Sequence, residues 1–162
     1  EMLISGGLAS DETQARQKLQ QVLDNGKAAE TFARMVFALG GPADFVENYD
    51  SHLLKAEIMR PVYAQSSGIV TGMDTRALGM AVVALGGGRL RAADLIDHAV
   101  GLTDVISLGA QADKEVPLAW VHARTEAQYE QTAAVIRNAI QVGDNTVTPS
   151  PAIYRRITLA DV

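Results

Sequence analysis

The sequence contains no cysteine, which excludes thiol catalysis, disulfide bonds and thiolate metal sites. Aromatic residues make up only 5% of its 162 residues, so we expect a mainly aliphatic core. Basic residues are also few, because 14 Lys and Arg stand against 19 Asp and Glu and give a formal net charge of −5. A general nucleic-acid binder needs a basic stripe to contact phosphates, and this balance does not supply one.

Long apolar runs are absent as well. The longest are far shorter than the roughly 20 residues that a membrane-spanning helix requires, and the sequence has no basic region followed by an apolar stretch at its start. At 48% hydrophobic and 20% charged residues, the composition is typical of a soluble globular protein, and we expect it in the cytoplasm. Because the first residues, Glu1–Ile4, already follow a helical pattern, we expect the chain to be part of a larger protein.

Residues 1–55 show the apolar spacing of helices. Ser10 can cap the first long helix through its hydroxyl. Four apolar residues of this helix recur at the spacing of one buried face: Ala15, Leu19, Val22 and Leu23. A second helix carries its own stripe from Ala28 to Leu39, including Phe32, and the run Gly40-Gly41-Pro42 is expected to end it.

From residue 56 onward the pattern changes to short β-like runs between glycines. Strands are expected at 58–63, 68–71, 105–108, 118–122 and 153–157, with Pro61 at a sheet edge because proline cannot donate to a ladder. Asp74 is expected to cap a helix that runs to Gly86, in which Gly79 suggests a close backbone neighbour.

Thr125 and Gln128 form a capping box for a last helix, which is expected to end at Gly143. Its buried stripe is expected to comprise Tyr129, Ala133, Ile136 and Ile140. Helices first and a β-rich unit second argue for an α+β fold, divided into residues 1–55 and 56–162.

The run Gly86-Gly87-Gly88-Arg89 is the most conspicuous local motif. It follows a helix and does not precede one, and it matches neither common phosphate-loop pattern, so we interpret it as a helix end with close backbone packing. Asp94, Asp97 and His98 are close enough to suggest a metal or acid-base site. A metal site needs three or four converging ligands, and we therefore interpret these residues as an exposed acidic turn with capping side chains.

The other polar candidates stand apart. His52 and His122 have no recognisable catalytic partner, and the pair Ser66-Ser67 lacks the surroundings of a nucleophile elbow. The residues themselves thus predict no catalytic, substrate-binding or metal-binding side chain.

Several ungapped blocks nevertheless resemble the pyrimidine nucleoside phosphorylase family, and the bacterial members that cleave thymidine in particular. The blocks in the β-rich part are Gly68–Ala81, with the run Met73-Asp74-Thr75-Arg76, then Leu85–Arg89, Asp94–Gly101 and Pro117–Ala123. The helical part is similar at Glu1–Gly6, Val22–Glu30 and Asp44–Tyr49. One departure lies at Gly109–Glu115, where the family often has Gly-Val-Gly but this chain has Ala112 for the valine and no second glycine.

The resemblance implies an enzyme in which phosphate attacks C1′ of thymidine and releases thymine and 2-deoxyribose 1-phosphate. It implies that residues 1–55 belong to the large α/β domain and that residues 56–162 form the C-terminal α/β-hammerhead, which is similar to barrel-sandwich carrier domains. The family's phosphate loop and base-binding residues lie upstream of these blocks and have no counterpart here, so no catalytic residue is carried over. The chain is then a structural scaffold that is inactive by itself.

Further expectations follow from the resemblance. The partner of this chain is the rest of the phosphorylase, which forms a homodimer through a helical domain not contained in these residues. Phosphate is a co-substrate and no cofactor is expected.

Two alternatives remain open. One is a biotinyl- or lipoyl-like carrier modified at Lys114, although this lysine is flanked by Asp113 and Glu115 and not by the methionines of a biotinyl site. The other is a free-standing anion-binding module at Gly86–Arg89.

Overall fold

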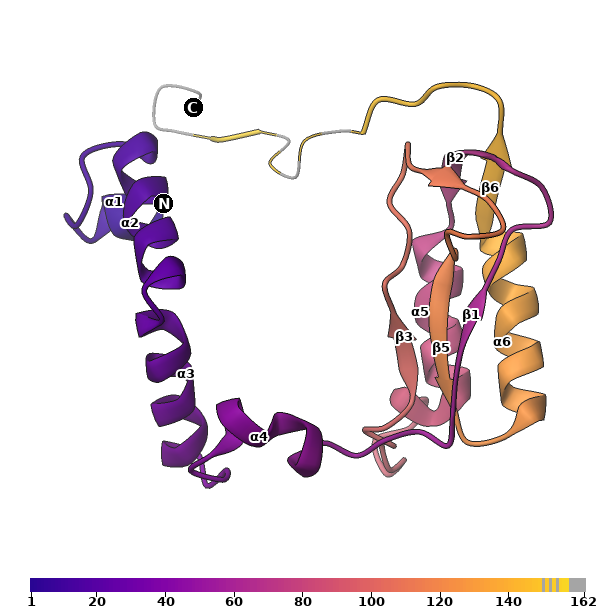
Figure 1. The fold of residues 1–162 in the computed structure, drawn as a ribbon, viewed down its shortest axis with the longest axis horizontal. Coiled ribbons are helices and arrows are strands. Elements are labelled where there is room, and N and C mark those ends of the chain that lie inside the picture. The colour runs from indigo at the N-terminus through magenta and orange to yellow at the C-terminus, as the bar shows by residue number, and fades with distance from the viewer. Residues whose placement is uncertain (150, 152, 154, 158–162) are drawn as a thin grey trace. The chain divides into compact units, whose positions relative to one another are not determined.

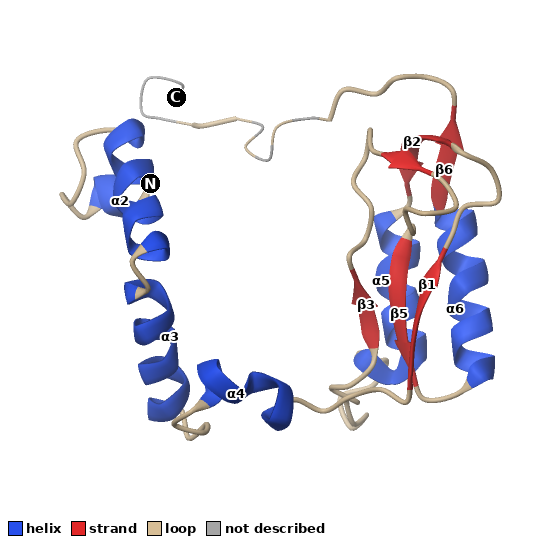
Figure 2. Ribbon diagram, in the orientation of Figure 1, coloured by secondary structure: helices blue, strands red, loops and turns tan. Residues whose placement is uncertain are grey.

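The computed structural model describes residues 1–149, 151, 153 and 155–157. They form two compact units, Glu1–Leu53 and Leu54–Val162, which we call unit 1 and unit 2 (Figure 1). Each unit is considered by itself. The expected α+β class is confirmed, because helices precede a unit that combines helices with two small sheets (Figure 2).

Unit 1 consists of helices. Their bounds are α1 Met2–Ser5, α2 Glu12–Asp24, α3 Lys27–Ala38 and α4 Phe45–His52. Gly26, with a φ of 80°, lets the chain turn between α2 and α3 in a left-handed conformation that residues with side chains rarely adopt.

The expected cap of α2 is wrong by one residue. Asp11 is the N-cap, and its carboxylate accepts from the Gln14 amide at 2.8 Å. Ser10 lies outside the helix, where its hydroxyl donates to Asp11 and its amide donates to the Gln14 side chain. Ser10 and Asp11 are both residue types that favour the N-cap position. Asp11 occupies it because its backbone has the extended conformation typical of an N-cap.

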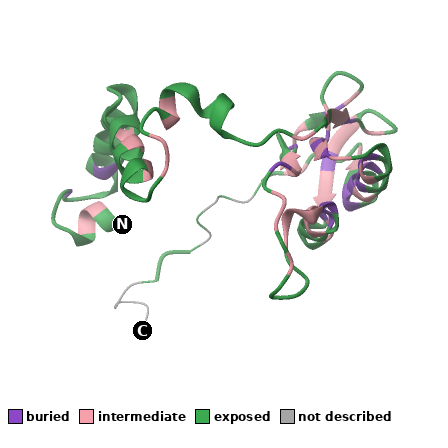
Figure 3. Ribbon diagram, turned by 90° about the horizontal axis from the view of Figure 1, so that it is seen from below, coloured by how far each residue is buried: buried purple, intermediate pink, exposed green. Residues whose placement is uncertain are grey.

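The apolar stripes of unit 1 do not form a core of their own. All residues of unit 1 are described, and only Ala9 and Ala15 among them are buried, as the predominance of exposed residues in Figure 3 also shows. On the stripe that runs from Ala28 to Leu39, Phe32 is 45% exposed and Leu39 is 81% exposed. The prediction of helices is confirmed, but within this unit the buried face expected along α2 is wrong beyond Ala15.

Unit 2 contains two antiparallel sheets of three strands each. The first has the order β1-β5-β3 and the second has the order β4-β2-β6. The strands are β1 Ile58–Val62, β2 Gly68–Met73, β3 Gly101–Thr103, β4 Gln111–Ala112, β5 Ala119–Ala123 and β6 Ile140–Gly143. Pro61 lies on the edge strand β1 opposite Trp120, as expected for a residue that cannot donate to a ladder.

The helices of unit 2 complete its core. They are α5 Thr75–Val82, continued by the π-helical turn η1 Val83–Gly87, and α6 Glu126–Ala139. Helix α6 packs on α5, β1 and β5. The largest fully buried side chains belong to strands, to α6 and to the residue before β5: Leu118, Ile136, Val62, Val70 and Val121.

One strand prediction fails for a physical reason, and a second falls partly outside the described residues. The strand expected at 105–108 is absent, and β3 lies just before it, because Asp104 takes a φ of 49° and turns the chain. Ile106 is nevertheless buried, and its amide donates to the Leu118 carbonyl at 2.9 Å. The strand expected at 153–157 includes Tyr154, which lies outside the described residues, and its described members are not in a strand.

In unit 2, the predicted starts of the two α-helices are confirmed, and the predicted end of one of them is wrong. Asp74 caps α5 by accepting from the Ala77 amide, and Thr125 and Gln128 form the predicted capping box of α6. Helix α6 stops at Ala139, whereas Gly143 was expected to end it, because residues from Ile140 onward pair with β2. The predicted buried stripe of Tyr129, Ala133, Ile136 and Ile140 is confirmed, although Ile140 already belongs to β6.

Candidate functional site

The glycine run ends the first helical segment of unit 2. Gly86 has a φ of 99°, and its carbonyl accepts from the Asp97 amide at 2.9 Å. A Cβ at Gly87 would lie 2.9 Å from the Val82 Cγ1 atom, so only glycine fits without movement. The predicted helix end with close packing is confirmed. Anions bind at helix amino-termini, whereas Gly86 and Gly87 form the carboxyl end of η1 and Gly88 is its C-cap.

Asp94, Asp97 and His98 do not converge on a common point. The Asp94 carboxylate accepts from the amides of Leu90 and Arg91 at 3.0 and 2.8 Å, so it caps a bend. Asp97 accepts from the Ala99 amide at 3.0 Å, and His98 is exposed. The described residues contain no group of three or more His, Asp, Cys or Glu side chains that could hold a metal ion. The predicted capping role of the acidic residues is thus confirmed.

Arg124 is the partner of Asp97, and no pattern in the sequence indicates this pairing. The Arg124 Nε and Nη2 atoms donate to the two carboxylate oxygens of Asp97 at 2.7 and 2.9 Å. Such a two-point contact fixes the plane of the guanidinium as well as its position. Because 27 residues separate the pair, local spacing in the sequence cannot reveal it.

This ion pair dominates the local electrostatics. Hydrogen bonding to Arg124 is the largest cause that lowers the pKa of Asp97 to about 2, and the Ala99 amide adds to it. The carboxylate in turn raises the pKa of Arg124. Asp97 therefore stays ionised over the whole neutral range, so it is an anchor for Arg124 and a poor general acid or base.

The two other candidate histidines make separate local contacts. In unit 1, the His52 Nε2 atom lies 2.9 Å from Asp44 Oδ1. In unit 2, the His122 Nε2 atom lies 2.9 Å from the Thr103 hydroxyl on the neighbouring strand. Across the described part of the chain, no carboxylate bonds to the His122 imidazole, so the pair lacks the third group of a hydrolytic triad.

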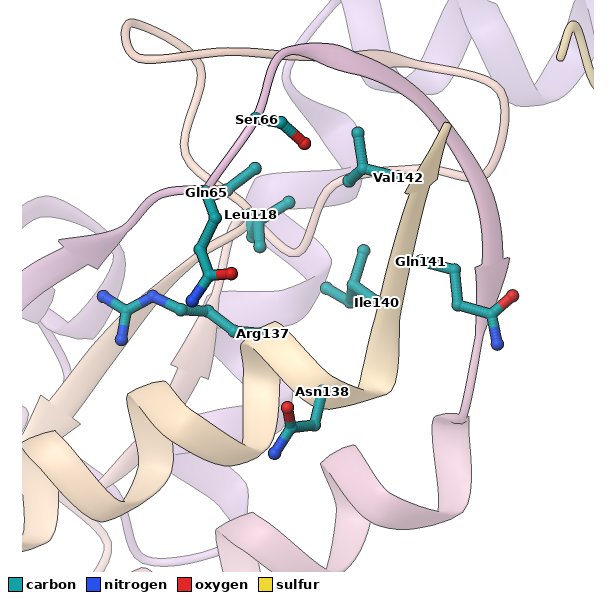
Figure 4. Close-up of a pocket in the computed structure, with 9 residues that line it drawn as sticks. Gln65, Ser66, Leu118, Arg137, Asn138, Ile140, Gln141 and Val142 are labelled. Atoms are coloured by element: carbon teal, nitrogen blue, oxygen red, sulfur yellow. The ribbon is translucent and has the colours of Figure 1, made fainter. Parts of the chain in front are cut away.

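A depression of about 370 Å³ contains Ser66, the remaining serine candidate (Figure 4). The apolar side chains of Leu118 and Ile140 lie in its middle, whereas those of Asn138 and Gln141 point away from them. Arg137 uses its Nε atom to bind the Tyr63 carbonyl at 3.3 Å. The polar groups of this depression therefore do not converge on one point, and Ser66 has no base beside it there.

Lys114 lies in an exposed turn whose shape is set by its neighbour. The Asp113 carboxylate accepts from the amides of Glu115 and Val116 at 2.7 and 2.8 Å. The turn joins β4 to β5, which belong to different sheets. A carrier domain needs its modified lysine at the tip of a paired hairpin, so this topology does not favour modification of Lys114.

At Gly109–Glu115 the sequence differs from the family's Gly-Val-Gly pattern, but its first glycine keeps a left-handed backbone conformation. Gly109 has a φ of 81°, and a Cβ there would lie 2.7 Å from the Val147 carbonyl oxygen. Ala112, which replaces the expected valine, is fully buried in β4 opposite Gly68. The smaller side chain is thus accommodated without loss of the strand pair.

Most of unit 2 matches a known protein family. Residues 69–143 match the family model described as the pyrimidine nucleoside phosphorylase C-terminal domain. Unit 2 contains a pyrimidine nucleoside phosphorylase C-terminal domain. The family consists of pentosyltransferases, which act in nucleoside metabolism.

The phosphorylase domain includes the features described above. The match begins within β2, ends with β6, and contains the glycine run, Asp97 and Arg124. The resemblance inferred from blocks of sequence is therefore confirmed for the family. Within the described residues, no helix has the length and apolar character to cross a membrane.

Proposed function

We propose that this chain is part of a pyrimidine nucleoside phosphorylase that acts on thymidine, and that its 162 residues serve as scaffold. In the full-length enzyme, phosphate attacks C1′ of thymidine, the C1′–N1 bond breaks, and thymine departs as 2-deoxyribose 1-phosphate forms. The enzyme uses phosphate as co-substrate and needs no cofactor. It is bacterial and cytoplasmic and forms a homodimer through a helical domain outside these residues.

The roles of the polar side chains support the scaffold assignment. The carboxylates of Asp94 and Asp97 accept hydrogen bonds from backbone amides of turns, and Asp97 also binds Arg124. Thr125 and Gln128 cap α6. Phosphorolysis requires groups that position phosphate and stabilise charge on the departing base, and these groups belong to other parts of the enzyme.

The surface of unit 1 supports its assignment to the large domain. Large apolar side chains remain exposed along the stripes of α2 and α3, among them Leu23 at 64%, Met35 and Phe32. Large apolar side chains that stay exposed along a helix face are typical of a segment that packs against further protein. We propose that the large α/β domain covers it.

Complementation of the separated parts tests the proposal. The 162-residue chain is mixed with the amino-terminal part of a thymidine-cleaving family member that lacks the blocks resembling this chain, and release of base from thymidine and from uridine is followed. We expect no release by either part alone and phosphate-dependent release of base by the mixture, with the preference between thymidine and uridine set by the amino-terminal part, which holds the base-binding residues. A mixture that releases neither base would contradict the phosphorylase assignment.

A pair of variants on α3 sharpens the experiment. Met35→Asp places a charge on the exposed apolar stripe, where Met35 is 49% exposed, and should weaken complementation, because burying an unpaired carboxylate is costly. Arg34→Asp changes charge at an exposed polar position of the same helix and should leave complementation intact. Equal effects of the two substitutions would argue against docking through the apolar stripe.

A further inference from the structure

We propose that Arg124 anchors the connector between the two units by holding the main chain of Lys55 to unit 2. We define the connector as residues 53–57, which lie between the end of α4 at His52 and the start of β1 at Ile58. The two compact units divide within it, between Leu53 and Leu54. The Arg124 Nη1 atom donates to the Lys55 carbonyl oxygen at 3.2 Å, just past that division.

The guanidinium of Arg124 is oriented for this contact. Its Nε and Nη2 atoms are both used by Asp97, and the remaining Nη1 atom points to Lys55. A lysine could supply only a point charge at this place, whereas the planar fork binds the carboxylate and the carbonyl together. The side chains of Arg124 and Asp97 are 35% and 31% exposed, so solvent competes with the contact only in part.

Both members of the ion pair are attached to the body of unit 2. The Asp97 amide donates to the Gly86 carbonyl, so the carboxylate is tied to the glycine run. The Arg124 amide donates to the Gln128 side chain at 3.0 Å, within the capping arrangement of α6. The Lys55 carbonyl is therefore connected through Arg124 and Asp97 to α6 and to the end of η1. Both of these segments contribute side chains to the core of the unit.

The anchor sets where the chain can hinge. With the Lys55 carbonyl held, movement between the units is concentrated at Leu53 and Leu54, and loss of the bond removes this main-chain restraint on the part of the connector next to β1. Glu57 also lies near enough to raise the pKa of Arg124 by its charge, which adds a second attraction between Arg124 and the connector. This role does not depend on the reaction that the full-length enzyme catalyses.

Trypsin offers a direct test, because it cleaves after Lys55 and the carbonyl it must attack is the one that Arg124 binds. We expect Arg124→Ala to accelerate cleavage after Lys55 by about tenfold, the effect of losing a hydrogen bond to a charged group. Arg124→Lys should behave like Arg124→Ala, and Asp97→Asn should give a smaller acceleration. Peptide-resolved hydrogen exchange should show faster exchange confined to residues 53–57.

Cleavage after Arg137, within α6, serves as the internal control for general unfolding. Arg60→Ala serves as the matched variant, since Arg60 pairs with Glu126 and stacks on Tyr129 in the same unit. In the Arg124 and Asp97 variants, the rate of cleavage after Arg137 should stay unchanged. In Arg60→Ala, the rate of cleavage after Lys55 should stay unchanged. An unchanged rate after Lys55 in Arg124→Ala, or equal acceleration after Lys55 and Arg137, would overturn the proposal.

Discussion

Substitution by alanine should have opposite effects on the stability of unit 2 at two glycines of the same helical segment, Gly79 in α5 and Gly86 in η1. Gly79 lies inside α5 at an exposed position, and a Cβ there would meet nothing within 4 Å. Alanine should therefore stabilise the helix by about 1 kcal/mol, since glycine in a helix interior gives up more backbone entropy. This geometry corrects the close backbone neighbour expected at Gly79 from the sequence, because the described residues provide none.

Gly86 has the opposite requirement. Its φ of 99° lies in the left-handed region, where a Cβ crowds the following carbonyl and costs about 1–2 kcal/mol. Space is not the difficulty, because the nearest atom to a Cβ at this position would be the Asp97 Cβ at 3.9 Å. Gly86→Ala should therefore destabilise unit 2 by backbone strain alone.

Urea and thermal unfolding measure both effects. Trp120 is the single tryptophan of the chain and lies half-buried in β5, so its fluorescence reports on unit 2. For a domain of this size, about 1 kcal/mol corresponds to roughly 4–8 °C in Tm, so Gly79→Ala should raise Tm by that amount and Gly86→Ala should lower it by at least as much. A lower Tm for Gly79→Ala, or an unchanged Tm for Gly86→Ala, would refute this reasoning.

Three further substitutions test other parts of unit 2. Ile136→Ala should lower the free energy of unfolding by about 2–5 kcal/mol, because it leaves a cavity at a fully buried position, and an unchanged urea midpoint would contradict the described core. Thr125→Ala should cost about 1 kcal/mol by removing the cap of α6, whereas Thr125→Ser should restore most of it in the same assay. Asp97 has a pKa of about 2 in the folded chain against an ordinary value of 3.8, so it binds protons less readily when folded. Its contribution to the free energy of unfolding should be fully present above about pH 4 and lost as the pH falls through 2. Asp97→Asn should make the free energy of unfolding depend less on pH in this range. Equal acid dependence in both proteins would argue against the ion pair.

Local signals in the sequence predicted local structure well. The capping box of Thr125 and Gln128, the Asp74 cap and the edge position of Pro61 each depend on residues a few positions apart, and the structure has all three. The interpretation of the glycine run is confirmed as well, because its place after a helix is visible in the sequence.

Predictions failed where the outcome depends on distant residues. Ile140 fits a helical stripe and a strand equally well, and the pairing of β6 with β2, far earlier in the chain, decides in favour of the strand. The contacts of Arg124 with Asp97 and Lys55 likewise join segments that no periodicity connects. The exposure of the apolar stripe in unit 1 could not be predicted either, since spacing shows that a face is apolar and not what covers it.

The central claim is that these residues support a phosphorylase without performing its chemistry. The most direct test incubates the purified 162-residue chain, at high concentration, with thymidine and inorganic phosphate and follows thymine by chromatography. Our account predicts no phosphate-dependent thymine above the level without protein. Sustained release of thymine that requires both phosphate and the chain would contradict it.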